Sequence, residues 1–176
     1  KKRAELLESY KEQGSNINPL VLIQIPDSKV GVIDKKDDII QILKDKFKIT
    51  LENRKLAIYL SDKDDKINLE NIEKQDNETE VLIFKQAIAI GWDCPRASIL
   101  VLFRDWKSIE FSIQTIGRIM RMPDYRHYEI EELNKGYVFT NLSDIKIAED
   151  IAKDYITIYE AKRRSDIYKN LDLPSV

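Results

Sequence analysis

Short, nearly continuous apolar runs recur along this chain, separated by segments of a different periodicity. Such runs are typical of strands that are buried on both faces of a parallel sheet. A charged helical pattern, 1–8, precedes the first run, and an amphipathic pattern at about 37–47 follows it. The alternation predicts an α/β fold with a mostly parallel sheet covered by helices on both faces. The predicted strands are Leu20–Ile25, Leu56–Leu60, a run beginning at Val81, Ile99–Phe103 and Gly136–Thr140.

The remaining segments are read from weaker patterns. The stretch 61–80 is acidic and lacks a tight apolar pattern, so a loop with at most one short helix is expected there. A long helical element is expected over about 144–169, with Ile145, Ala148, Ile151, Tyr155 and Ile158 on one stripe. Ile39, Ile40, Leu43 and Phe47 share the apolar face of the helix at 37–47.

Length and composition bound the kind of protein. The 176 residues, 43% of them hydrophobic, suffice for one domain with a real core, and we expect a single domain over 1–176. No apolar run is long enough for a membrane span, and one cysteine excludes an internal disulfide. We therefore expect a soluble, cytoplasmic protein without membrane partners.

One predicted helix carries two arginines a turn apart. Ser108 can cap it, and Gln114, Arg118 and Arg121 line up beside its apolar stripe. Gly117 in the helix interior costs about 1 kcal/mol relative to alanine, and the like charges repel. These costs favour an anion site with something packed close to the glycine. The alternative is a solvated basic face.

A second segment, 81–97, reads as a buried strand, a short link and a sharp turn. Gly91 permits an unusual backbone conformation, and Pro95 ends any helical continuation. Asp93 is then held on a turn near strand ends. In an open parallel sheet such turns border the ligand crevice, where a carboxylate can accept a hydrogen bond from a sugar hydroxyl or orient an arginine. The alternative is a purely structural turn.

Together these segments resemble motifs V and VI of the superfamily 2 helicases and translocases. Gly91-x-Asp93-x-Pro95 matches motif V, and Gln114-x-x-Gly117-Arg118-x-x-Arg121 matches motif VI. The residue sequence Gly91-Trp92-Asp93-Cys94-Pro95 is most similar to that in the motor of type III restriction enzymes, the Res subunit. The resemblance implies a RecA-like (P-loop NTPase-like) three-layer domain, the second lobe of a helicase motor.

The resemblance also implies roles for individual residues. Arg118 and Arg121 would be catalytic arginine fingers that reach the γ-phosphate of ATP, where a supplied arginine contributes about 10³ to 10⁵ in rate. Gly91, Asp93, Gln114 and Gly117 would lie on the nucleotide-binding side. Lys85 and Gln86 stand where motif V often has a threonine, and Ser28 follows a strand that resembles motif IV. These three residues would contact the nucleic-acid backbone.

A motor of this kind also needs a Gly-x-x-x-x-Gly-Lys-Ser/Thr loop and a Walker B acid. Neither is recognised in these 176 residues. ATP and Mg²⁺ would therefore be bound mainly by an N-terminal RecA-like lobe, this chain would be a fragment of a longer polypeptide, and it would be inactive alone. The family implies DNA, a C-terminal nuclease domain and a methyltransferase (Mod) subunit as partners. An RNA helicase lobe and a non-catalytic α/β interaction module of helicase ancestry remain as alternatives.

Charge is unevenly distributed around a net value of −2. Residues 85–126, which include Arg96, hold seven basic and four acidic residues, whereas 61–80 hold eight acidic and three basic. The first region is expected to face phosphates and the second to repel them. One cysteine and one histidine cannot form a metal site, so no metal ligand is expected; Cys94 is not expected to act as a nucleophile, and His127 is expected on a surface loop.

Overall fold

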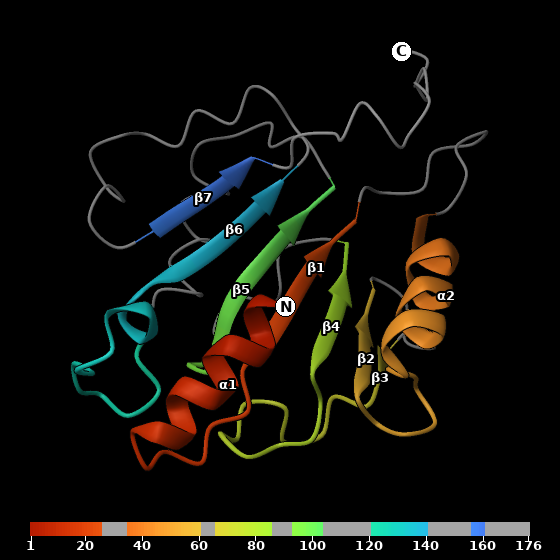
Figure 1. Ribbon diagram of the computed structural model, residues 1–176. Coiled ribbons are helices and arrows are strands. Elements are labelled where there is room, and N and C mark those ends of the chain that lie inside the picture. Colours follow the sequence, from red (N-terminus) through yellow and green to blue (C-terminus); the bar gives the residue numbers. More distant parts are fainter. Residues whose placement is uncertain (26–34, 61–65, 86–92, 104–120, 141–155, 161–176) are drawn as a thin grey trace.

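A seven-stranded sheet organises the part of the chain that the computed structural model describes, which is 1–25, 35–60, 66–85, 93–103, 121–140 and 156–160 (Figure 1). The strand order is β3-β2-β4-β1-β5-β6-β7. The strands are β1 (Leu20–Gln24), β2 (Leu56–Tyr59), β3 (Lys66–Ile67), β4 (Val81–Phe84), β5 (Ala97–Leu102), β6 (Gly136–Thr140) and β7 (Ile156–Glu160).

Parallel pairing dominates this sheet. β1 lies at its centre, with Leu22 opposite Leu82 of β4 and Leu100 of β5. β2 pairs in parallel with β4, β6 with β5, and β7 with β6, whereas β3 runs antiparallel to β2. The mostly parallel α/β fold predicted from the apolar runs is thus confirmed, and the five predicted strands agree with β1, β2, β4, β5 and β6 to within about two residues at each end.

Both described helices pack against the same face of the sheet. α1 (Lys2–Glu12) buries Leu6 and Tyr10 over Ile99 of β5, and α2 (Lys35–Phe47) buries Leu43 over β1 and β4. A short 3₁₀ helix, η2 (Glu131–Asn134), joins the α1 cluster through Leu133. The predicted helices at the start of the chain and at 37–47 are therefore confirmed.

The opposite face of the sheet has its own apolar cluster. Leu22, Leu82 and Leu100 point into it because side chains alternate along each strand. Ile72 and Cys94, which come from the loops before β4 and β5, pack against these strands. Strands that are apolar on both faces explain why the runs in the sequence are continuous rather than alternating.

A hollow of about 660 Å³ opens on the helix-bearing face, between α1 and α2. Val21, Val81 and Val101 line its floor. Phe47 stands at its rim, is 56% exposed and lines the hollow together with Leu43, as expected of residues on one face of α2. Phe47 is the last residue of α2, whereas Leu43, one turn earlier, is buried.

One expectation about the secondary structure needs correction. The prediction of one long helix over about 144–169 is wrong at Ile156–Glu160, which form β7 and pair with β6 along its whole length. β-branched and aromatic residues fill that segment, and their preference for strands prevails over the helical spacing. Within 66–80, the structure has the two-residue strand β3 followed by turns, so the loop is confirmed and no short helix forms in these described residues.

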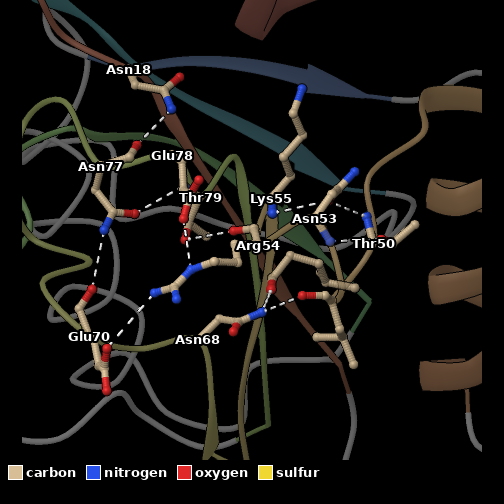
Figure 2. Close-up of polar contacts among 12 residues, drawn as sticks. Asn18, Thr50, Asn53, Arg54, Lys55, Asn68, Glu70, Asn77, Glu78 and Thr79 are labelled. Atoms are coloured by element: carbon tan, nitrogen blue, oxygen red, sulfur yellow. Dashed lines mark hydrogen bonds and ion pairs between the residues drawn. The ribbon is translucent and has the colours of Figure 1, made fainter.

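The loops at the start of β2 and β4 are joined by a polar network (Figure 2). Arg54 forms ion pairs with Glu78 at 2.7 Å and with Glu70 at 3.8 Å, and its carbonyl accepts a hydrogen bond from the Thr79 hydroxyl. The Asn77 side chain caps the Thr79 amide at 2.9 Å. These contacts hold the segment 70–79 against the end of the sheet, where short-range side-chain bonds replace regular secondary structure.

α1 ends in a Schellman motif. The Ser15 amide donates to the Tyr10 carbonyl and the Gly14 amide to the Lys11 carbonyl, each at 2.9 Å. Gly14 has φ +69°, a left-handed conformation that glycine adopts without a steric penalty. This turn determines where Ser15 leaves the helix.

We expect Gly14→Ala to lower the free energy of unfolding of the chain by about 1 kcal/mol, measured by urea titration, because a Cβ is unfavourable in the left-handed region. A Cβ at this position would meet no heavy atom within 4 Å, so the loss would come from the backbone alone. Gly14→Asn should lose less, since asparagine tolerates this conformation. Equal stability of the alanine and wild-type chains would contradict the left-handed backbone conformation assigned to Gly14.

Candidate functional site

The parallel strands define two opposite edges of the sheet, which we call the amino edge and the carboxyl edge (Figure 1). Lys85 directly follows β4 and therefore lies at the carboxyl edge. Asp93 lies four positions before the start of β5 and therefore lies near the amino edge. Two predicted site residues that are close in sequence are thus at opposite ends of the strands.

This placement corrects one expectation. Asp93 was expected at the ligand crevice of an open parallel sheet, which by the general rule lies at the carboxyl ends of strands. The end of β4 and the start of β5 lie at opposite edges, because β4 and β5 both run parallel to β1. Any ligand that Asp93 contacts must approach from the amino edge.

Buried groups that directly follow Asp93 in the sequence hold its turn in place. The Ala97 amide donates to the Cys94 carbonyl at 2.9 Å, and the Cys94 side chain is 2% exposed. Burial raises the pKa of the Cys94 thiol to about 11, with the charge of Arg96 opposing the shift. The thiol is therefore protonated at neutral pH, which is consistent with a packing role and not with that of a nucleophile.

An ion pair joins Asp93 to Arg121, between Oδ1 of the carboxylate and Nη1 of the guanidinium. The two side chains are 50% and 48% exposed, so the pair lies at the surface and can be reached from solvent. Its partners come from the two motif-like segments, which are 28 positions apart in the sequence. Charge-assisted pairing of this kind orients a guanidinium without burying it.

Arg96 is the residue that sequence reasoning misplaced most. It was counted among the basic residues that face phosphates, but its side chain is fully buried. Nε donates to the Ile72 carbonyl at 2.8 Å, and Nη1 donates to the carbonyls of Asn18 and Thr79 at 2.7 and 2.9 Å. Burial lowers the pKa of Arg96, yet a guanidinium starts so high that it stays charged.

Its place in the sequence carries no signal of this role. Arg96 stands between Pro95 and the apolar run that becomes β5, and an arginine at such a turn is usually exposed. Its partners are three backbone carbonyls and the Asn77 side chain, all in other segments of the chain, so no local pattern in the sequence identifies them.

The loop after Arg121 is held at the same edge by Asp124. Its carboxylate accepts hydrogen bonds from the Ser15 hydroxyl at 2.7 Å and from the Gln75 amide at 3.2 Å. Partial burial alone would raise the pKa of Asp124, but the hydrogen bond from Ser15 and the charge of Arg126 outweigh it, and the pKa lies below its usual value. The carboxylate therefore stays ionised and keeps the loop attached to α1 and to the segment before β4.

The other candidate residues divide into described and undescribed ones. Lys85 is partly buried, and its carbonyl lies 3.5 Å from the Gln24 side-chain amide. His127 is exposed on the loop before η2, as predicted. The remaining predicted site residues lie outside the described residues: Ser28, Gln86, Gly91, Gln114, Gly117 and Arg118.

The hollow on the helix-bearing face is separate from the Asp93–Arg121 pair. The hollow between α1 and α2 has an apolar floor and is lined by neither residue. Within the described ranges, no group of three or more His, Cys, Asp or Glu side chains is placed to hold a metal ion. No helix in these ranges is long and apolar enough to cross a membrane.

Comparison with known families agrees with this geometry. The model of the helicase conserved C-terminal domain matches residues 5–123, which include both motif-like segments. The chain belongs to the helicase C-terminal domain family. The mostly parallel sheet is that of a RecA-like second lobe. Among curated proteins, none matches the chain significantly.

We expect Arg96→Met to lower the free energy of unfolding of this helicase lobe by at least about 3 kcal/mol, because the carbonyls of Asn18, Ile72 and Thr79 and the Asn77 side chain would lose the guanidinium as a donor. Arg54→Ala is the matched control: its ion pairs are half exposed, and such pairs contribute about 0 to 1 kcal/mol. Urea titration of both variants checks this. A loss at Arg96 no larger than that at Arg54 would show that the buried guanidinium is not an anchor.

Proposed function

We propose that this chain is the second motor lobe of an ATP-dependent DNA translocase or helicase, and that Arg118 and Arg121 supply positive charge to the γ-phosphate of ATP. Family membership and the order of the two motifs support this proposal. The observation that carries it is the surface ion pair between Asp93 and Arg121. A guanidinium that is oriented but still reachable is suited to stabilising charge on a phosphate bound by a facing lobe.

In this mechanism Asp93 holds Arg121 in position while the cleft is open. The ion pair engages Nη1, and a guanidinium carries five N–H donors, so an incoming phosphate can bind at other nitrogens. Closing the cleft removes water and strengthens that interaction as charge spreads over the transferred phosphoryl group. A nucleotide on the first lobe, with Mg²⁺, is thus the ligand for which the pair is arranged.

Nucleic acid would bind at the other edge of the sheet. Lys85 lies at the carboxyl edge, and Gln86 and Ser28 follow β4 and β1 in sequence. A lysine at this edge can contact a backbone phosphate without reading sequence. The two ligands would then lie on opposite edges, and closure against ATP would move the strand-contacting edge as part of the same rigid lobe.

Within this class we propose the Res subunit of a type III restriction-modification system, on the basis of Gly91-Trp92-Asp93-Cys94-Pro95. Its partners would be an N-terminal RecA-like lobe and a C-terminal nuclease domain of the same polypeptide, a methyltransferase subunit and DNA, in the cytoplasm. An RNA helicase lobe is the alternative. Stimulation of the full-length ATPase by duplex DNA and not by duplex RNA separates the two.

In the full-length protein, Arg121→Ala should lower the DNA-stimulated ATPase kcat by about 10³-fold, because an arginine finger acts mainly in the transition state. Arg121→Lys should not restore it, since lysine lacks the planar fork. Arg54→Ala removes an ion-paired arginine that is 53% exposed, close to the 48% of Arg121, and should leave the rate unchanged. Unchanged turnover in Arg121→Ala would favour a non-catalytic module instead.

Lys85→Ala should raise the DNA concentration for half-maximal ATPase stimulation and reduce the slope of log affinity against log salt by about 1, because one phosphate contact is lost. The kcat at saturating DNA should stay near the wild-type value, since Lys85 lies at the edge opposite Asp93. Lys55→Ala, at the amino edge just before β2, is the control. If the two lysine variants respond alike to DNA, the carboxyl edge is not the nucleic-acid side.

A further inference from the structure

Tyr125 combines two features that are unfavourable in a merely structural loop residue. Its side chain is 89% exposed, and its backbone has φ +52°. A bulky side chain is rarely found in the left-handed region, and an exposed aromatic ring forgoes the burial that would favour it. Strain of this kind persists only where the surrounding structure imposes it, and it is concentrated at functional sites.

The surrounding structure does impose this conformation. The Asp124 carboxylate accepts a hydrogen bond from the Ser15 hydroxyl at 2.7 Å, and the Arg126 guanidinium donates one to the oxygen of the same hydroxyl at 2.9 Å. Arg126 also donates to the Gln13 carbonyl at 3.2 Å. The residues on both sides of Tyr125 are therefore tied to the end of α1, and the ring between them is directed outward into solvent.

Contacts of Pro123 and Arg126 also hold the loop that carries Tyr125. Gln75 donates to the Pro123 carbonyl at 2.8 Å, and Pro123 is buried. The guanidinium of Arg126 lies 5.0 Å from the centre of the Tyr128 ring, which packs edge-to-face on Tyr10 of α1. The exposed ring is thus mounted on a loop that is anchored at Pro123, Asp124 and Arg126.

The backbone of Tyr125 lies close to that of Arg121. The Tyr125 amide donates to the Met122 carbonyl at 3.2 Å, which closes a turn directly after Arg121. A β-turn brings its first and last Cα atoms within about 7 Å, so the Cα of Tyr125 lies within about 11 Å of that of Arg121. Tyr125 also lies two positions beyond the end of the family match at residue 123, outside the part shared across the family.

We propose that Tyr125 is a stacking platform for the nucleobase of the nucleotide whose γ-phosphate meets Arg121. The inference rests on the proposed function, because it needs a nucleotide at the amino edge. An aromatic ring held rigidly in solvent offers a preformed face to a planar base, so little ordering cost accompanies binding. Stacking depends on the π-face that every base has, so the platform favours nucleotides over bare phosphates without distinguishing adenine from guanine.

The test compares inhibitors of the full-length ATPase that share phosphates and differ in the base. Tyr125→Ala should raise the Ki of ADP and of GDP by about tenfold, equivalent to about 1.4 kcal/mol, and leave the Ki of inorganic tripolyphosphate unchanged. Tyr125→Phe keeps the ring and should behave as wild type. His127→Ala removes another exposed ring from the same loop and is the matched control.

Three results would overturn the proposal: unchanged Ki values for both nucleotides, an equal rise for tripolyphosphate, or the same loss in Tyr125→Phe as in Tyr125→Ala. The second would mean that the variant disturbs the phosphate site, and the third that the hydroxyl and not the ring is needed. The Arg121→Ala result separates this proposal from the function on which it rests. If Arg121→Ala abolishes turnover while Tyr125→Ala leaves the nucleotide Ki unchanged, only the nucleobase platform is refuted.

Discussion

The buried guanidinium of Arg96 is the interaction on which the geometry of the amino edge depends. It joins the chain entering β1, at Asn18, to the segment before β4, at Ile72 and Thr79, and to its own turn before β5. These backbone carbonyls and the Asn77 side-chain oxygen, 3.3 Å from Nη2, all accept from the guanidinium, so the charge is solvated by the protein rather than neutralised by a carboxylate. The turn that presents Asp93 is therefore built on a rigid base, although Asp93 itself is half exposed.

The two binding functions proposed for this lobe, for nucleotide and for nucleic acid, lie at opposite edges of one sheet. Asp93 and Arg121 lie at the amino edge and Lys85 at the carboxyl edge, and the central strands β1, β4 and β5 connect them through paired backbones. Apolar side chains fill both faces of these strands, and close-packed interiors transmit displacement rather than absorb it. A lobe of this construction moves as a unit, which is what coupling between a nucleotide cleft and a nucleic-acid groove requires.

Sequence reasoning succeeded where side-chain pattern and burial agree, and failed where tertiary contacts decide. Continuous apolar runs predicted β1, β4 and β5 because a strand buried on both faces has no other pattern available. At 156–160 the helical spacing was misleading, since pairing with β6 decided the outcome. Asp93 and Arg121 were predicted as site residues from their spacing, but the edge on which Asp93 lies depends on the parallel pairing of β4 and β5 with β1, which no local pattern in the sequence records. Arg96 was misread because a charge usually indicates exposure.

The amino edge is assembled from segments that carry no recognisable motif. Ser15, which follows the Gly14 turn of α1, contacts both Asp124 and Arg126, 109 and 111 positions further along the chain. The direction in which the loop after Arg121 leaves the sheet is therefore determined by the end of the first helix. Because Asp93 is fixed through Arg96 and the loop after Arg121 through Ser15, the ion pair forms where two independently anchored segments meet. A helicase lobe arranged in this way can change the loop that carries Tyr125 without altering the strands that support the pair.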